Sequence, residues 1–270
     1  ASRPRAVALL SSSMSEVLLY PDEPPAFHIE RESGSSPYLL VCDHASQTIP
    51  RGLGSLGLGA EDLQRHIAWD IGAARVTALL SERLDACAIS TNYSRLVIDA
   101  NRPPHTPQSI VTVSEVTPVP GNSDLPPEQV ALRERSLFTP YHECIRTQLD
   151  RRVQQGVRTA LCSVHSFTPK FLGELRPWHA SVLYNRDPRL GRALRDELRS
   201  DAELIIGDNE PYRVSDETDY TVVVHGEQRG IPYLMIELRQ DLIERTPGQL
   251  AWADRLARAL PALLTHVWPE

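Results

Sequence analysis

Short runs of apolar, strand-forming residues alternate along this chain with longer segments whose apolar residues recur at helical spacing. The short runs predict strands near 37–42, 86–91, 95–99, 159–165, 180–184, 204–206 and 232–238. The amphipathic segments predict helices near 60–84, 124–155, 187–200 and 246–267. Because strand and helix patterns keep alternating, the sequence predicts an α/β fold.

Two segments show neither pattern and predict long loops. Residues 102–127 contain seven prolines and no helical period, and residues 208–219 are polar and rich in turn-forming residues. Long loops inside a compact domain are usually functional. No linker or internal repeat divides the sequence, so we expect an irregular N-terminal extension over 1–25 and a single domain over 26–270.

Composition argues against several classes of protein. The 270-residue chain has a formal net charge of −7 and no basic stripe, which argues against a nucleic-acid partner. Its apolar runs fall short of the roughly 18 residues that a membrane-spanning helix needs, so we expect no membrane partner. Its four cysteines form no C-x-x-C pair, which favours reduced thiols in a cytoplasmic protein over disulfides or a thiolate metal site.

Four short blocks of chemically versatile residues close or follow predicted strands. They are Asp43-His44, Asp99-Ala100-Asn101-Arg102, His165-Ser166-Phe167 and Ile236-Glu237-Leu238-Arg239. Open α/β sheets bind their ligands at the carboxyl ends of buried strands. Two histidines, a carboxylate and an arginine delivered to such ends predict a metal-dependent hydrolase that acts on an anionic substrate.

The two strand-end histidines, His44 and His165, are candidate metal ligands. Catalytic zinc takes three protein ligands, usually histidines and a carboxylate, and leaves one position for water. Asp70 is the candidate third ligand, because we expect it inside the 60–84 helix among apolar neighbours, where a carboxylate needs a partner. Asp43 and Gln47 compete with Asp70 for this position.

A second cluster, on the predicted strand 95–99 and just after it, suits an anion. Arg95, Asn101 and Arg102 lie close together in sequence, and the planar guanidinium fork matches a carboxylate. The structural alternative is an ion pair between Arg102 and Asp99.

Glu237 ends the predicted strand 232–238, where a carboxylate is costly unless it is paired. A general base beside a metal-bound water fits this position. An ion pair with Arg239, on the same face of the strand, is the structural alternative. Three other histidines, His66 and His142 on helices and His105 in the proline-rich loop, are expected at the solvated surface.

At these residues the chain resembles the N-formylglutamate amidohydrolases, relatives of the zinc carboxypeptidases, over roughly 37–265. The most specific stretch is Ser94-Arg95…Asp99-Ala100-Asn101-Arg102-Pro103. The other matching blocks are Asp43-His44-Ala45-Ser46, Trp69-Asp70, Pro140-Tyr141-His142, His165-Ser166, His225-Gly226 and Glu237-Leu238.

This resemblance implies a mixed, mostly parallel sheet flanked by helices, with the zinc-exopeptidase (phosphorylase/hydrolase-like) architecture. It implies one zinc ion with His44 and His165 among its ligands, and Glu237 as the base. Arg95 or His225 would steady the oxyanion. The expected substrate contacts are Asn101, Arg102, Ser166 and Tyr212.

The chain departs from the related patterns in ways that bear on ligands and substrate. Zinc carboxypeptidases take their first two ligands from an H-x-x-E block, which here reads His44-Ala45-Ser46-Gln47, so Asp70 becomes the expected third ligand. Formylglutamate deformylases usually show Pro-His-Ser/Ala-Gly where this chain has Asp43-His44-Ala45-Ser46, and their Gly-Gly segment before the His-x-Gly block is missing. The substrate could therefore be another acyl-amino acid or amide.

The expected function is metal-assisted hydrolysis of the amide bond of a small N-acylated amino acid, with N-formyl-L-glutamate as the named substrate and formate and glutamate as products. The alternatives are a zinc-dependent peptidase or deacylase of another anionic amide, and a non-catalytic anion-binding protein on the same fold. The expected partner is a small anionic molecule, and the sequence leaves the oligomeric state open.

Overall fold

The computed structural model of the chain describes residues 17–269. Its centre is a seven-stranded sheet in the order β1-β3-β2-β6-β11-β9-β10. The strands are β1 (Phe27–Glu30), β2 (Tyr38–Cys42), β3 (Cys87–Thr91), β6 (Ala160–Phe167), β9 (Ala180–Leu183), β10 (Ile206–Asp208) and β11 (Tyr233–Arg239).

Most neighbouring strands of this sheet are parallel. Strands β3, β2, β6 and β11 form a parallel core, and β10 runs parallel to β9. Strand β1 is antiparallel to β3, and β9 is antiparallel to β11. The core strands β2, β3 and β6 are buried at every position, as expected for strands rich in apolar residues whose two faces are both covered.

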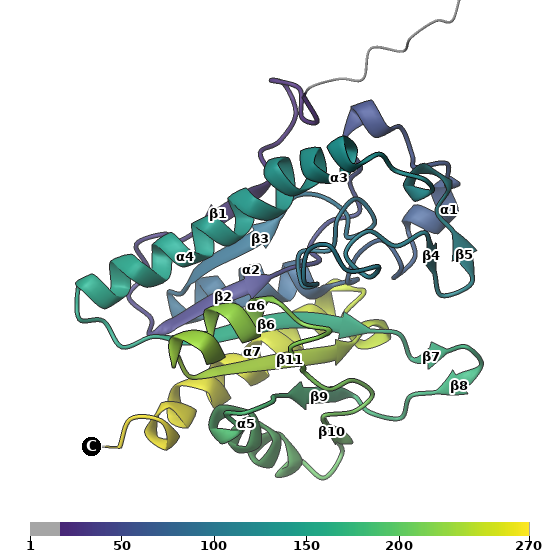
Figure 1. Cartoon of the computed structure of the whole chain (residues 1–270). Helices are drawn as coiled ribbons and strands as arrows, with labels where there is room; N and C mark the ends of the chain where they lie inside the picture. The colour runs from purple at the N-terminus through teal and green to yellow at the C-terminus, as the bar shows by residue number, and fades with distance from the viewer. Residues whose placement is uncertain (1–16, 270) are drawn as a thin grey trace, which may run out of the picture.

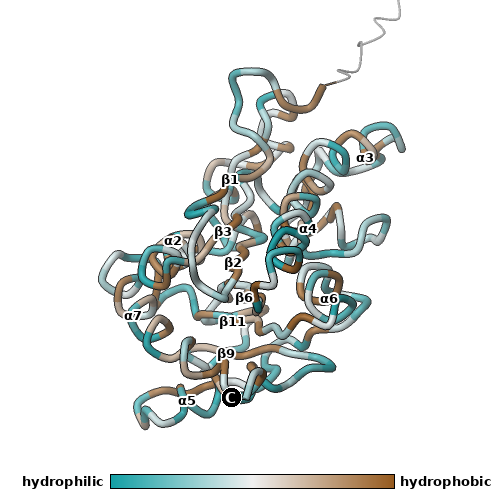
Figure 2. The backbone as a smooth tube through the Cα atoms, turned by 90° about the vertical axis from the view of Figure 1, so that its left-hand side faces the viewer, coloured by the Kyte–Doolittle hydropathy of each residue, from teal (hydrophilic) through white to brown (hydrophobic). Residues whose placement is uncertain are grey.

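Helices cover both faces of the sheet (Figures 1 and 2). One face carries α2 (Ala73–Leu84), α5 (Arg189–Arg199) and α7 (Thr246–Leu263), which pack against one hydrophobic cluster. The opposite face carries α4 (Thr139–Gln154) and α6 (Thr221–His225), which pack against a second cluster. The expected mixed, mostly parallel sheet flanked by helices is therefore confirmed.

The helix expected at 124–155 is present but not uniform. It comprises α3 (Pro127–Arg133), a π-helical stretch (Glu134–Phe138) and α4. Pro140 has no N–H to donate to the carbonyl of Ser136, and a widened turn before a proline is a common response of a helix to that loss.

The prediction of one continuous helix over 60–84 is wrong for the middle of that segment. Only α1 (Ala60–Leu63) and α2 are helical, and residues 64–72 form turns. Gly72, with a φ of 83°, stands at the start of α2 in a left-handed conformation that a continuous helix does not contain. Asp70 therefore lies in the connection before α2, where its N–H donates to the His44 carbonyl at 2.9 Å.

The strand expected at 95–99 is also wrong, because residues 92–100 form turns. Strand β3 already has β1 on one edge and β2 on the other, so no edge is free for another strand there. Local side-chain bonds stabilise the turns instead: the Ser94 hydroxyl donates to the Ala68 carbonyl, and Asp99 accepts the N–H of Asn101.

Two small hairpins interrupt the expected loops. The pair β4 (Val113–Ser114) and β5 (Thr117–Pro118) lies in the 102–127 segment, and the pair β7 (Lys170–Phe171) and β8 (Glu174–Leu175) follows β6. Both hairpins project at the side of the molecule toward which β6 and β11 point (Figure 1). Helix α6 lies where the sequence predicted no element.

The start of the domain lies partly outside the description. Of the extension expected over 1–25, residues 1–16 lie outside the described residues, while 17–25 form turns and bends. None of the helices within 17–269 combines the length and apolar composition that a bilayer crossing requires.

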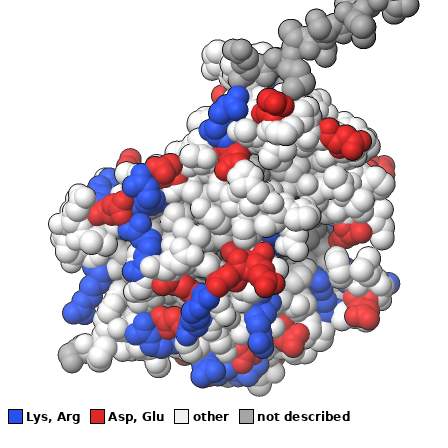
Figure 3. All heavy atoms as spheres, viewed as in Figure 1, with Lys and Arg blue, Asp and Glu red and all other residues white. Residues whose placement is uncertain are grey.

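On the face drawn in Figure 3, acidic and basic side chains are intermixed rather than gathered into one basic area.

We predict that Gly72→Ala destabilises the protein by roughly 2–5 kcal/mol. A Cβ at Gly72 would lie 2.2 Å from the Ile243 carbonyl oxygen, in addition to the cost of the left-handed backbone. Gly156→Ala is the matched control: its φ is 67° but no atom lies within 4 Å of the added Cβ, so about 1 kcal/mol is expected. Urea unfolding measures both, and equal losses would disprove the close approach.

Candidate metal centre and active-site pocket

Alternation along three neighbouring strands brings the predicted residues to one face of the sheet. In β6, Leu161 belongs to the cluster beneath α4 and α6, so His165, four residues later, faces the same side. Glu237 of β11 pairs in register with His165. His44 follows β2, the other neighbour of β6, so the carboxyl ends of three adjacent strands supply one site.

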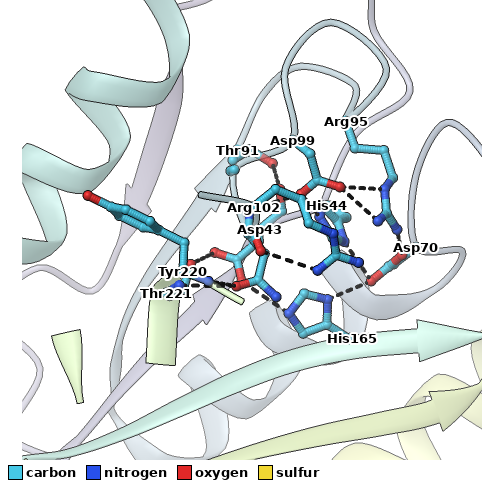
Figure 4. Close-up of polar contacts among 12 residues, drawn as sticks. Asp43, His44, Asp70, Thr91, Arg95, Asp99, Arg102, His165, Tyr220 and Thr221 are labelled. Carbon is cyan, nitrogen blue, oxygen red and sulfur yellow. Dashed lines mark hydrogen bonds and ion pairs between the residues drawn. The ribbon is translucent and has the colours of Figure 1, made fainter. Parts of the chain in front are cut away.

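The carboxylate of Asp70 lies between the two imidazoles (Figure 4). Nδ1 of His44 is 3.3 Å from Oδ2 of Asp70, and Nδ1 of His165 is 2.8 Å from the same oxygen. One ligand atom from each of the three residues lies within 4.8 Å of the others, and all three residues are buried. The structure thus brings together the three expected ligands in a group that could hold one metal ion.

The outer nitrogen of each imidazole is bound by another carboxylate. Nε2 of His44 donates to Asp99 at 2.7 Å, and Nε2 of His165 donates to Asp43 at 3.0 Å. Such bonds fix the tautomer and orientation of a metal-binding histidine and leave the opposite nitrogen for the ion. Two Nδ1 atoms and a carboxylate oxygen form a donor set that suits zinc.

Buried carboxylates control the charge of His165. Burial alone would lower the pKa of His165, but its hydrogen bonds with Asp43 and Asp70 hold that pKa well above the usual value. For Asp70, burial alone would raise the pKa, but the charge of His44 and the hydrogen bond with His165 hold it well below the usual value. The proton of His165 and a metal ion therefore compete for the same side of the imidazole.

Asp43 lies behind His165 rather than beside the ion position. Its Oδ1 accepts the Tyr141 hydroxyl at 2.8 Å and the Thr221 hydroxyl at 2.7 Å, so α4 and α6 both hold it. Gln47, the other alternative ligand, is exposed and does not line the pocket described below. Of the competing ligands, only Asp70 faces both Nδ1 atoms.

Glu237 is buried without a partner for one of its oxygens. Its Oε2 has no hydrogen bond among the described residues, and Arg239 pairs with Asp241 at 2.8 Å instead. The alternative of a Glu237–Arg239 ion pair is therefore wrong. Burial raises the pKa of Glu237 to about 8.

A pocket of about 590 Å³ opens over these residues. It is lined by His44, Asp70, His165 and Glu237, and by side chains of the 95–115 and 212–219 segments. Such a volume is within the range of small-molecule sites. The ion position and the unpaired glutamate thus face one cavity.

Arg95 and Arg102 both line this pocket but differ in their partners. Nε and Nη2 of Arg95 donate to Asp99 at 3.1 and 2.8 Å, and Nη1 lies 3.5 Å from Asp70. Arg102 donates to the Thr218 carbonyl and lies 4.0 Å from Asp219. The alternative of an Arg102–Asp99 ion pair is wrong, because Arg95 takes that carboxylate.

Asn101 secures the loop that carries Arg102. Its side-chain oxygen accepts the N–H groups of Tyr220 and Thr221, and its amide donates to Asp219 at 3.2 Å. Asn101 lines the pocket while joining the loop after β3 to the start of α6.

The other expected contacts differ in their positions. Ser166 lines the pocket, but its hydroxyl donates to the Ile71 carbonyl at 3.0 Å. Tyr212 lines the pocket and is 40% exposed, which leaves it accessible to a ligand. His225 does not line the pocket; its Nε2 lies 3.0 Å from Nδ1 of His142. His225 is therefore not positioned to steady an oxyanion in this pocket, the role that the sequence suggests.

The surface positions expected for His66 and His142 are wrong. His142 is 6% exposed, and its Nε2 donates to the Ala100 carbonyl, so it supports the Asn101 loop from behind. His66 lines the pocket, and its Nδ1 is buried without a hydrogen-bond partner among the described residues. His105 is exposed as expected, with 73% of its side chain accessible.

Sequence reasoning missed the part that Asp99 plays in the site. Asp99 joins Arg95 to the outer nitrogen of His44, whereas the sequence suggests Asp99 only as a partner of Arg102. The four-residue spacing of Arg95 and Asp99 is a signal that could have revealed their pairing.

Comparison with known proteins identifies the relationship of this chain. The sequence model of the N-formylglutamate amidohydrolase family matches residues 36–244. The chain belongs to this family. Family membership places the protein among enzymes that hydrolyse amides.

Two solved structures are similar to this N-formylglutamate amidohydrolase family member. Gene product Atu2144 from Agrobacterium tumefaciens is 35% identical with a TM-score of 0.89, and the match covers 93% of this chain and 99% of that one. N-formylglutamate amidohydrolase from Ralstonia eutropha JMP134 is 16% identical with a TM-score of 0.63, covering 91% and 98%, and so shows the shared fold. No match was found among curated proteins.

His142 and His225, which contact each other behind the pocket, predict that the stability of the fold falls in acid. Burial lowers the pKa of His142 to about 4 and that of His225 to about 3, against roughly 6.5 in an unfolded chain. The unfolded state therefore binds more protons below pH 6.5. Stability is lost as pH falls from about 6.5 toward 4, by up to roughly 1.4 kcal/mol per pH unit for each histidine.

His225→Gln tests this effect, because glutamine retains a donor for His142 but does not titrate. The slope of unfolding free energy against pH, measured by urea unfolding between pH 6 and 4.5, should become shallower by up to about 1.4 kcal/mol per pH unit. His266→Gln, at an exposed position, is the control and should keep the wild-type slope. An unchanged slope in His225→Gln would contradict the buried neutral state.

Proposed function

We propose that this protein is a zinc-dependent amidohydrolase that cleaves the amide bond of a small N-acylated amino acid. N-formyl-L-glutamate, giving formate and glutamate, is the substrate that we name first. The observation that carries the proposal is the convergence of His44, His165 and Asp70 in one pocket with a buried, unpaired Glu237.

The residues present fit a zinc ion. Two imidazole nitrogens and one carboxylate oxygen match the three protein ligands of hydrolytic zinc sites, which leave a fourth position for water. The outer carboxylates, Asp43 and Asp99, supply the second set of contacts that such histidines require. When bound there, zinc would polarise the substrate carbonyl and lower the pKa of water.

In this proposal Glu237 moves the proton. It accepts a proton from the attacking water and returns it to the leaving nitrogen as the C–N bond breaks. Its burial disfavours the charged form, whereas a neighbouring dication favours it, so Glu237 can exchange a proton near neutral pH. The carboxylate has no hydrogen bond at Oε2 that would have to break first.

The arginines bind and polarise the substrate. Arg102 contacts the substrate carboxylate, because its guanidinium is held by carbonyl oxygens rather than by a carboxylate at hydrogen-bond distance. Asn101 holds the Arg102 loop and borders the same anion. Arg95 steadies the developing negative charge through Nη1, which is not bonded to Asp99 and has only a long contact of 3.5 Å with Asp70.

A deacylase with a larger acyl group is the second candidate. The pocket of about 590 Å³ has room for more than a formyl group, and its lining includes the apolar side chains of Phe171, Leu183 and Met235. The same metal ligands and base would serve either substrate.

The first test measures turnover of N-formyl and N-acetyl derivatives of glutamate, glutamine, leucine and lysine, followed by release of free amino acid. We expect the N-acyl glutamates to be cleaved, and a chelator to abolish turnover until zinc is restored. Preference for the acetyl compound would select the second candidate. Absence of turnover with every compound by zinc-loaded protein would contradict both.

The second test separates metal binding from proton transfer. Glu237→Gln should retain zinc but reduce kcat by about 10²–10⁴-fold, because the amide is not a base. His165→Ala should lose both zinc and turnover. Glu197→Gln on the exposed surface of α5 is the matched control and should behave as wild type. Near-normal kcat/KM in Glu237→Gln, with zinc content measured on the same sample, would exclude the proposed role.

A further inference from the structure

Arg213 is the one arginine of the pocket lining that makes no ion pair or hydrogen bond within residues 17–269. It lies on the loop between β10 and α6, is exposed, and lines the cavity beside Tyr212. Arg95 differs because it forms an ion pair with Asp99, and Arg102 differs because the carbonyl oxygens of Thr218 and Asn101 accept its N–H groups. The guanidinium of this pocket-lining arginine is therefore not engaged by any protein group among the described residues.

A second arginine without a carboxylate partner, Arg176, packs against two residues of the pocket lining. Arg176 is only 8% exposed, and within the described part of the chain it forms no ion pair. Its guanidinium carbon lies 4.9 Å from the centre of the Tyr212 ring and 4.7 Å from that of Phe171, two residues that line the pocket. A buried cation without a counter-charge is costly, and a negative ligand nearby reduces that cost.

The acidic side chains that line the pocket form no ion pair with Arg213 or Arg176 among the described residues. Asp70 lies against the two histidines, and Glu237 points to no arginine within ion-pair distance. Asp99 is taken by Arg95 and His44, and Glu115 is taken by Arg65 at 2.9 Å. Asp219 accepts hydrogen bonds from Asn101, Ser215 and Thr218. The positive charge on the Tyr212 side of the pocket is thus left for a ligand.

We propose that Arg213, supported by the charge of Arg176, forms a second anion subsite that binds the side-chain carboxylate of the substrate. This inference rests on the proposed function, in which Arg102 takes the first carboxylate and the amide lies over the metal ligands. Arg102 and Arg213 come from different loops: Arg102 lies on the loop after β3, and Arg213 lies on the loop before α6. A substrate that satisfies both is an N-acyl derivative of an acidic amino acid, with two carboxylates.

The kinetic experiment compares N-formyl-L-glutamate with N-formyl-L-glutamine, which has the same length but a neutral side-chain amide. In Arg213→Gln, KM for the glutamate compound should rise roughly tenfold or more relative to KM for the glutamine compound, since a charge-assisted bond is lost. Arg213→Lys should recover part of the preference, because charge remains without the fork. Arg258→Gln, at an exposed position on α7, should leave both KM values unchanged.

A binding experiment without turnover distinguishes failure of this inference from failure of the proposed function. Calorimetry on zinc-loaded protein should detect glutarate binding that weakens in Arg213→Gln, whereas pentanoate binding should respond much less. If no N-formyl compound is cleaved but glutarate still depends on Arg213, the proposed reaction fails and the dicarboxylate subsite stands. If Arg213→Gln affects both substrates and both acids equally, or none of them, the second subsite is disproved.

Discussion

A carboxylate buried between two imidazoles is the constraint on which the site depends. Asp70 is 1% exposed and His44 and His165 are each 2% exposed, so none of the three can rely on water for its charge or its hydrogen bonds. A buried charge is tolerated only when it is paired, and each imidazole must therefore be bonded at both nitrogens. Asp99 and Asp43 provide the outer bonds, which leaves three carboxylates around two histidines. This excess of negative charge is best balanced by protons or by a divalent cation, and the two compete for the same lone pairs.

The surrounding fold can be understood as the support for that arrangement. Parallel strands β2, β6 and β11 deliver His44, His165 and Glu237 near their carboxyl ends, at the same edge of the sheet. The loops supply what the strands cannot, since Asp70 is bound through its N–H to the His44 carbonyl, and Asp99 lies in a turn stabilised by its own side chain. The long connections are therefore ordered by polar contacts to the site rather than by regular secondary structure.

The sequence predicted the elements whose signal is local and the residues that lie at their ends. Strand ends identified His44, His165 and Glu237 because an apolar run that stops at a polar residue requires no knowledge of the partner strand. The apolar neighbours of Asp70 indicate a buried carboxylate even though the helix predicted around it is wrong, since Gly72 shows its left-handed conformation only in the folded chain. The pairing of Asp99 with His44 and the burial of His142 could not be predicted, because each depends on contacts between segments about 40 to 55 residues apart. Likewise, Arg239 pairs with Asp241 rather than with Glu237, and strand alternation alone could not decide between these two carboxylates.

Under the proposed function, the division of charge in the pocket would let one scaffold combine hydrolysis with recognition of an acid. Carboxylates dominate behind the two histidines, where they suit a cation, whereas guanidinium groups without a carboxylate partner dominate on the side of Tyr212 and Arg213. If these opposite charges were adjacent and free, they would neutralise one another and bind neither metal nor substrate. Arg95 differs from the other pocket arginines, because it is paired with Asp99 and lies 3.5 Å from Asp70. An anionic amide would then be oriented by its carboxylates at the arginines, with its carbonyl directed to the histidines, where Glu237 is placed to transfer the proton.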